Sequence, residues 1–120
     1  MSARAVAERF FTAFYSGDTQ GTRDAVTEDF ALLGPFATVH NADELLELGA
    51  GLMRVTRGHK ILRCVVADRE VAALYQIFIQ GPRGQSPLTV GGFFTAAGDR
   101  LSSGQVIYDS AAFDAIVSPS

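Results

Sequence analysis

Tyr75 and His40 are the two side chains in this sequence whose chemistry and predicted positions best suit work on a small molecule. Ala73, Tyr75, Ile77 and Ile79 alternate along a predicted strand and therefore share one face. If that face lines a pocket, the Tyr75 hydroxyl would donate a hydrogen bond to a ligand carbonyl or to a developing oxyanion. As a core residue it would donate to a backbone carbonyl instead. Both interpretations of Tyr75 are open at this stage.

His40 lies just ahead of a predicted helix, at the expected rim of such a pocket. A neutral imidazole is the most available general base near neutral pH. Asp43 and Glu44 follow closely, but their carboxylates suit the N-terminus of the helix, so the sequence gives His40 no obvious orienting acid. A catalytic histidine and an exposed histidine are both compatible with this position.

Apolar side chains with an inward position supply the candidate ligand contacts. Tyr108 stands near the end of the last predicted strand with Val106 beside it. The expected contact residues are Phe10, Phe14, Phe36, Ile77, Phe93, Val106 and Tyr108, and Phe94 is assigned to the same aromatic wall. Gly91 and Gly92 in a strand interior indicate a bulge, a bend of the sheet or the close approach of another group.

Acids and metal ligands are absent from the predicted pocket face. The thirteen acidic residues fall on predicted helix surfaces, at helix ends or at strand turns, although Asp29, Asp43 or Asp109 could lean in at the mouth. Cys64 is the only cysteine and there are two histidines, which excludes an internal disulfide and makes a protein zinc site improbable. There is no phosphate-binding glycine loop, so no cofactor is expected.

Composition limits the classes of function. The chain has 120 residues, of which 48% are hydrophobic and 19% charged, and we expect one domain over residues 1–120. A net charge of −3 argues against nucleic acid as a partner. No apolar run approaches the ~18 residues of a membrane span, and the charged Glu8 and Arg9 argue against a secretory signal, so cytoplasmic residence without membrane binding is expected.

A basic stretch follows the third predicted helix. Arg54, Arg57, Lys60 and Arg63 place four positive charges within ten residues. They would attract a carboxylate or phosphate. Alternatively, they complement the helix dipole and form a solvated edge, which is the more ordinary role of such a run.

The predicted elements are helices first and antiparallel strands afterwards. Ser2 caps a first helix that stops at Gly17, Asp18 caps a second to about residue 26, and Asn41 caps a third that ends before Gly58. Short strands flank the bend at Gly34 and Pro35. Four strands follow at about 59–67, 71–80, 88–96 and 101–108, and then a final helical turn or two. This order predicts an α+β domain in which helices cover a curved sheet and leave an apolar pocket.

Several segments resemble the nuclear-transport-factor-two-like superfamily, particularly its SnoaL-like and ketosteroid-isomerase-like members. They are AERFFTAFYSGD at 7–18, TED at 27–29, HNADEL at 40–45 and VIYD at 106–109 leading into AAF at 111–113. The resemblance covers almost the whole chain and implies a cone of three N-terminal helices on a curved, mainly antiparallel sheet, the cystatin-like roll. The superfamily contains isomerases, cyclases, epoxide hydrolases, dehydratases and non-catalytic proteins, so it implies little about chemistry.

The residues that ketosteroid isomerases use are not found at the matching positions. Those enzymes combine a carboxylate base with an oxyanion hole of a tyrosine and a protonated aspartic acid. Phe10 stands at the position of the tyrosine, Gly34 at that of the base and Gly91 at that of the second acid. Steroid isomerisation is therefore not expected, whereas a small apolar ligand in the cone is.

Two functions remain. The first is a SnoaL-like domain that binds a small apolar molecule and acts as an isomerase or cyclase of the polyketide or steroid type through Tyr75 and His40. The second is a non-catalytic carrier or assembly domain with a partly filled cone. The resemblance also implies a homodimer through the open sheet face, with Leu74, Phe78 and Phe94 as its apolar residues and Gln76 and Gln80 hydrogen-bonding across it.

Overall fold

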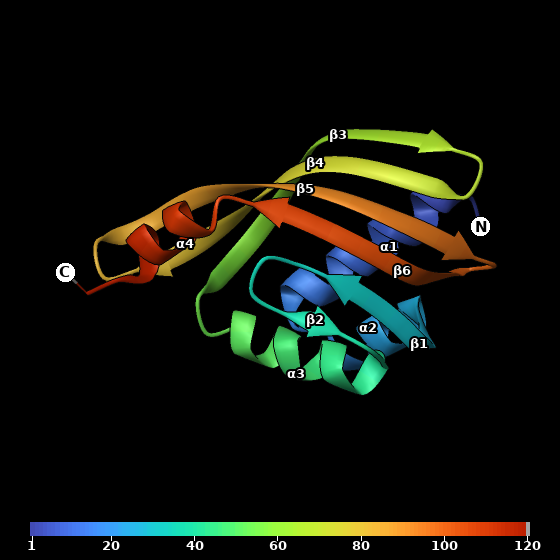
Figure 1. Ribbon diagram of the computed structural model, residues 1–120, viewed down its shortest axis with the longest axis horizontal. Coiled ribbons are helices and arrows are strands. Elements are labelled where there is room, and N and C mark those ends of the chain that lie inside the picture. The colour runs from blue at the N-terminus through green and yellow to red at the C-terminus, as the bar shows by residue number, and fades with distance from the viewer. Residues whose placement is uncertain (120) are drawn as a thin grey trace.

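A computed structural model describes residues 1–119 as a curved, open sheet with helices on one side (Figure 1). The elements are α1 (Ala3–Ser16), α2 (Thr19–Ala25), β1 (Val26–Leu33), β2 (Thr38–Val39), α3 (Ala42–Leu52), β3 (Thr56–Ala67), β4 (Glu70–Gly81), β5 (Gly84–Ala97), β6 (Arg100–Tyr108) and α4 (Ser110–Val117). Three N-terminal helices pack on a curved sheet, as expected. No helix in the described part of the chain is long and apolar enough to cross a membrane.

The predicted caps position the first three helices. The Ser2 hydroxyl accepts from the N–H of Ala5 at the start of α1, and Gly17 ends α1 with φ 76°, a left-handed conformation that favours glycine. Asp18 caps α2 in the same way. At α3 the Asn41 side chain accepts from the N–H of Glu44, whose carboxylate accepts in turn from the N–H of His40, one residue earlier than in an ordinary capping box.

The strand order in the sheet is β2-β1-β6-β5-β4-β3, and all neighbours are antiparallel except β1 and β6. The predicted meander of four strands is confirmed, but β3 begins at Thr56 and β5 at Gly84, each three or four residues before its expected start. Residues 27–29, expected at the end of a helix, lie inside β1. Register shifts in β3 against β4 and in β5 against β6 accompany the curvature of the sheet.

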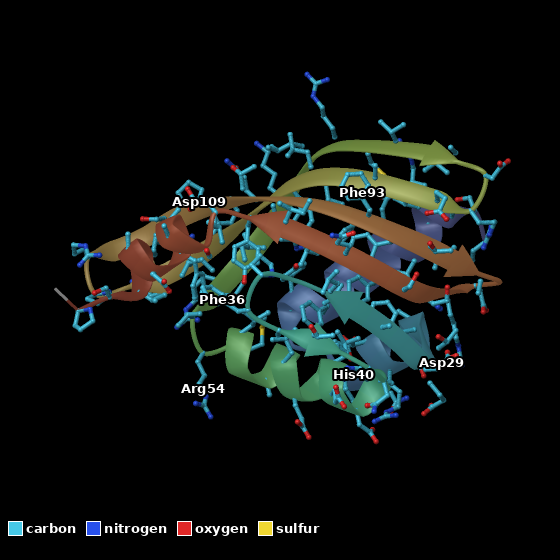
Figure 2. The ribbon with its side chains drawn as sticks, in the orientation of Figure 1. Asp29, Phe36, His40, Arg54, Phe93 and Asp109 are labelled. Atoms are coloured by element: carbon cyan, nitrogen blue, oxygen red, sulfur yellow. The ribbon has the colours of Figure 1, made fainter. Side chains whose placement is uncertain are left out.

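Phe93 and Phe94 face opposite sides of β5. Phe94 is 1% exposed and packs on the helix side, whereas Phe93 is 54% exposed and points away from the helices (Figure 2). Two neighbouring residues of a regular strand cannot share a face. The expectation that Phe93 lines the pocket is therefore wrong, and so is the expectation that Phe94 belongs to the outer face.

The aromatic face of α1 forms much of the core. Phe10, Phe11 and Phe14 are buried, with ring centroids of Phe10 and Phe14 5.3 Å apart. The buried face of β4 carries the predicted set that includes Tyr75 and Ile77. By contrast, α4 has no buried residue and lies at the far end of the hairpin formed by β4 and β5 (Figure 1).

Candidate functional site

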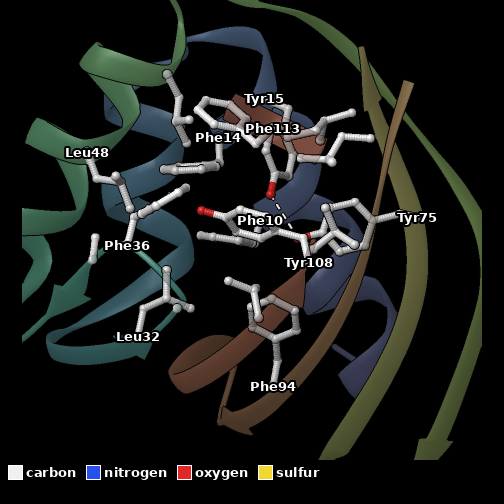
Figure 3. A pocket seen from close by; sticks show the side chains of 17 residues that line it. Phe10, Phe14, Tyr15, Leu32, Phe36, Leu48, Tyr75, Phe94, Tyr108 and Phe113 are labelled. Atoms are coloured by element: carbon white, nitrogen blue, oxygen red, sulfur yellow. Dashed lines mark hydrogen bonds between the residues drawn. The ribbon is translucent and has the colours of Figure 1, made fainter. Parts of the chain in front are cut away.

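A cavity of about 210 Å³ lies between α1, α3, α4 and the inner face of the sheet (Figure 3). α1 contributes Phe10 and Phe14, and α3 contributes Leu48 and Leu52. The sheet contributes Leu32 from β1, Ile77 from β4, Leu88, Val90 and Phe94 from β5, and Val106 from β6. None of the seventeen residues that form the wall is aspartate, glutamate, lysine, arginine or histidine. The polar atoms of its side chains are the hydroxyls of Tyr15, Tyr75 and Tyr108.

The structure brings most of the predicted site residues together at this cavity. Phe10, Phe14, Phe36, Tyr75, Ile77, Val106 and Tyr108 line it. Phe93 and His40 do not. On β4 the period of two showed which side chains share a face, and the family resemblance assigned that face to the pocket, whereas β5 carries two consecutive phenylalanines that leave its register undetermined.

The Tyr75 hydroxyl is bonded to Tyr15, which sequence reasoning did not single out as a functional residue. The two oxygens are 2.8 Å apart, and the dashed line in Figure 3 marks this bond among the side chains of the wall. Tyr75 therefore does not make the backbone contact considered as its structural role. The signal that could have identified Tyr15 is its spacing of four residues from Phe11, which turns both side chains toward the same side of α1.

Burial holds both hydroxyls of this pair in the neutral form. It raises the pKa of Tyr15 to about 12, with the hydrogen bond between Tyr15 and Tyr75 acting in the opposite direction. Burial also raises the pKa of Tyr75 well above 10, and a negative charge on Tyr15 would raise it further. At neutral pH both groups are protonated, so the pair can donate a hydrogen bond but does not act as a base.

Three aromatic rings form the rim of the cavity. Phe36, which is 56% exposed, lies with its ring centroid 6.0 Å from those of both Tyr108 and Phe113. Partial burial, and secondarily the charge of Asp114, raise the pKa of Tyr108. Within residues 1–119, no group forms a hydrogen bond with the Tyr108 hydroxyl.

His40 lies outside the cavity, on the surface beside α3 (Figure 2). Its side chain is 72% exposed, and its Nδ1 is 2.9 Å from Oε1 of Glu44. The expectation that no acid orients this histidine is thus wrong, because Glu44 both completes the α3 cap and holds the ring. The bond to His40 lowers the pKa of the Glu44 carboxyl. Held there, the imidazole does not reach a ligand inside the cone.

The acids considered for the mouth are engaged elsewhere. Asp43 pairs with Arg23, Asp109 caps α4 by accepting from the N–H of Ala112, and Asp29 is exposed on β1. None of them lines the cavity. Within the described part of the chain, no three His, Cys, Asp or Glu side chains are grouped closely enough to hold a metal ion.

Comparisons with known proteins identify the architecture. No protein-family model and no curated protein sequence matches the chain. Solved structures do match. A protein of unknown function from Burkholderia pseudomallei described as NTF2-like superposes with a TM-score of 0.83 at 15% identity, over 98% of this chain and 99% of that one. The chain has an NTF2-like fold.

Two further structures with this fold belong to proteins with named chemistry. A SnoaL-like candidate polyketide cyclase from Jannaschia sp. CCS1 matches with a TM-score of 0.79 at 16% identity, covering 98% of this chain and 93% of that one. An LEH-like epoxide hydrolase from M. tuberculosis matches with a TM-score of 0.80 at 17% identity, covering 95% of this chain and 88% of that one. At these identities the likeness extends to the NTF2-like fold alone, because one fold hosts many activities.

The NTF2-like cone of this chain has no polar side chain at the three positions matched to the ketosteroid-isomerase residues. Two of these positions line the cavity and the third does not. Phe10 and Gly34 line the cavity without a polar side chain. Gly91 does not line it, because Val90 and Gly92 take the inward positions on either side. The outward face of β5 therefore carries the residue that the sequence comparison matched to the second acid.

The basic stretch lies apart from the cavity. Arg57 donates to the backbone carbonyls of Met53, Arg54 and Thr56 around the C-terminal end of α3. Arg54, Lys60 and Arg63 are exposed, and Arg54 projects away from the NTF2-like core (Figure 2). The arrangement favours the interpretation of this stretch as a helix terminus with a solvated edge.

Proposed function

We propose that this protein binds a small, uncharged and mainly apolar molecule inside its cone. The observation that carries the proposal is the wall itself: aromatic and aliphatic side chains enclose about 210 Å³, and the side-chain polar groups among them are neutral tyrosine hydroxyls. Pockets that are mostly apolar with a few converging polar groups are typical small-molecule sites. A charged ligand would lose its hydration without gaining a counter-ion.

An isomerase or cyclase acting on a polyketide- or steroid-like molecule is the second candidate. Fold neighbours that include a candidate polyketide cyclase and an epoxide hydrolase favour an enzyme. A proton transfer, however, requires an acceptor within hydrogen-bond reach of the substrate. The wall offers Tyr15 and Tyr75 as donors to a carbonyl and no carboxylate or imidazole as a base, so the geometry supports binding better than catalysis.

A titration with tetralin, an uncharged bicyclic hydrocarbon, tests the binding function. Methyl NMR of the protein should show shifts at Leu48, Ile77 and Leu88, which line the cavity, and not at Ile107 on the outer face. Ala37→Phe at the mouth should weaken binding at least tenfold by filling the entrance. Ala50→Phe, at an exposed position on α3, is the matched control and should not. Shifts confined to the outer face, or none, would contradict the proposal.

We also propose a homodimer through the outer face of the sheet. Leu33, Leu74, Phe93 and Ile107 are exposed apolar side chains that support it, at 51%, 39%, 54% and 56%. Clusters of this kind on a sheet are characteristic of association surfaces. Phe93→Lys should convert a dimer to a monomer in sedimentation equilibrium, whereas Ala50→Lys should leave the mass unchanged. A wild-type monomer at all concentrations would contradict this part of the proposal.

A further inference from the structure

The pair formed by Tyr15 and Tyr75 has more hydrogen-bonding capacity than it uses. Each hydroxyl carries one hydrogen and two lone pairs. The single bond between the two oxygens, 2.8 Å long, uses one of the two hydrogens. Among residues 1–119, no backbone or side-chain group accepts the other. One hydroxyl hydrogen is therefore left over at the wall of the cavity.

The surroundings of the pair cannot satisfy that hydrogen. Phe11 lies 4.8 Å from Tyr75 and Phe14 lies 5.0 Å from Tyr15, measured between ring centroids. The nearest titratable ring is that of His59, 5.5 Å from Tyr15, and within the described residues it forms no hydrogen bond with either hydroxyl. A buried donor without an acceptor is unfavourable. A ligand with an acceptor atom would therefore be stabilised by the hydrogen bond that the protein itself leaves unmade.

We propose that the Tyr15 and Tyr75 hydroxyls form a polar subsite that selects ligands with one uncharged hydrogen-bond acceptor, such as a ketone or quinone carbonyl, on an apolar ring body. This inference rests on the proposed binding function and adds the chemical class of the ligand. It assigns a specificity-determining role to Tyr15. The donors come from positions other than Phe10, where the ketosteroid-isomerase resemblance would look for a tyrosine.

Charge disfavours ionic ligands at this wall, and the spare hydrogen favours a pure acceptor over an alcohol. A carboxylate would enter a wall without a cation, and an ammonium would enter one without an anion. An alcohol can also accept the spare hydrogen, but its own hydrogen must then meet an unused lone pair of a tyrosine oxygen, which adds a geometric requirement that a carbonyl does not have. A carbonyl oxygen accepts the spare hydrogen and adds no donor of its own. Both tyrosine hydrogens are then hydrogen-bonded. The raised pKa values of both tyrosines keep that hydrogen in place at neutral pH.

Two ligands that differ only at the carbonyl test the inference, namely α-tetralone and its hydrocarbon counterpart tetralin. Calorimetric affinities of both are compared for the wild type and for the double variant Tyr15→Phe/Tyr75→Phe. Both sites are replaced because a single variant leaves one hydroxyl with its hydrogen unused. His40→Ala, outside the cavity, is the control variant.

The expected result is a change in preference and not in overall binding. The affinity for α-tetralone relative to tetralin should fall by roughly three- to tenfold in the double variant, the range of one neutral hydrogen bond. Tetralin should bind both proteins within about twofold of each other, because phenylalanine keeps the shape of the wall. An unchanged preference, with both ligands bound, would overturn the subsite and leave the binding function intact. If the wild type bound neither ligand, both the polar subsite and the proposed binding function would be overturned.

An infrared measurement on the wild type covers the case in which the double variant does not fold. A hydrogen bond lowers the carbonyl stretching frequency, so bound α-tetralone should absorb at lower frequency than α-tetralone in hexane. A bound ketone with the hexane frequency would show that no donor reaches its oxygen, and would refute the subsite even if the ketone binds in the cavity.

Discussion

The ring of Phe94 lies directly against the backbone of Gly92, on the inner face of β5. A Cβ atom on Gly92 would stand 2.6 Å from Cε2 of Phe94 and 3.3 Å from Cε1 of Tyr75. Gly104 on the paired strand β6 is equally close to the same ring, at 2.6 Å from its Cδ1. Two glycines therefore leave the space in which Phe94 lies flat on the sheet and lines the cavity.

Gly92→Ala should displace Phe94 toward the cavity. We expect a loss of about 1–3 kcal/mol in the free energy of unfolding, as for other overpacked cores, and weaker tetralin binding. The neighbouring Gly91→Ala is the matched control, because its Cβ would face open space on the outer side with only the Ile107 carbonyl at 4.0 Å. Urea denaturation of the two variants measures the difference, and equal stabilities would contradict the described packing.

Stability should decrease in alkali because of the buried tyrosines. The pKa of Tyr15 is raised from 10.0 to about 12 in the folded protein, so between these values the unfolded chain ionises while the folded one does not. The stabilisation is present below pH 10 and is lost as the pH rises toward 12, by about 2–3 kcal/mol for this group.

Tyr15→Phe should flatten that decrease, because phenylalanine has no proton to release. Urea midpoints at pH 9 and pH 11 measure it, together with the tyrosinate absorbance of the folded protein. A folded wild type that ionises Tyr15 near pH 10 would refute the assignment of this hydroxyl to a buried, neutral pair.

His40→Ala should leave ligand binding unchanged. The imidazole is exposed and bonded to Glu44 at the start of α3, so its loss removes an interaction at a helix terminus and nothing from the cavity wall. In the same variant the carboxyl pKa of Glu44, lowered by the histidine, should move back toward its ordinary value. An NMR titration of the carboxyl group measures that change in pKa. A tenfold loss of tetralin affinity in the variant would contradict the placement of His40 outside the binding site.

Arg83 should hold α4 against the rest of the molecule. Its guanidinium, on the turn between β4 and β5, donates to the backbone carbonyls of Ala115 and Ser118 at the C-terminal end of α4. Since α4 has no buried residue, Arg83→Ala should raise amide exchange in α4 several-fold and speed ligand release past Phe113. Arg100→Ala, at the start of β6, is the control, and identical exchange in both variants would contradict this role.

The sequence determined the architecture because its signals are local. Ser2, Asp18 and Asn41 each cap the helix expected of them, since a cap depends on residues three positions away. The period of two along β4 predicted which side chains share a face, and the family resemblance supplied which face is buried. The start of β1 at Val26 was not predictable in this way, because pairing with β6 extends a polar segment that has little strand character of its own.

The site was only partly predictable because its key contacts are distant in sequence. The bond between Tyr15 and Tyr75 joins residues sixty positions apart, and neither local spacing nor composition reveals it. The inward face of β5 could not be chosen from the sequence, because polar and apolar residues do not alternate along Gly91, Gly92, Phe93 and Phe94. His40 looked available because the bond that engages it depends on the ring orientation at the α3 cap.

A crystal structure of the wild type with α-tetralone bound tests binding in the cone most directly. The proposal predicts the bicyclic ring between Phe10 and Ile77 inside the cavity, with the carbonyl oxygen within hydrogen-bond distance of the Tyr15 or Tyr75 hydroxyl. Ligand density on the outer face near Phe93, with the cavity free of ligand, would contradict it.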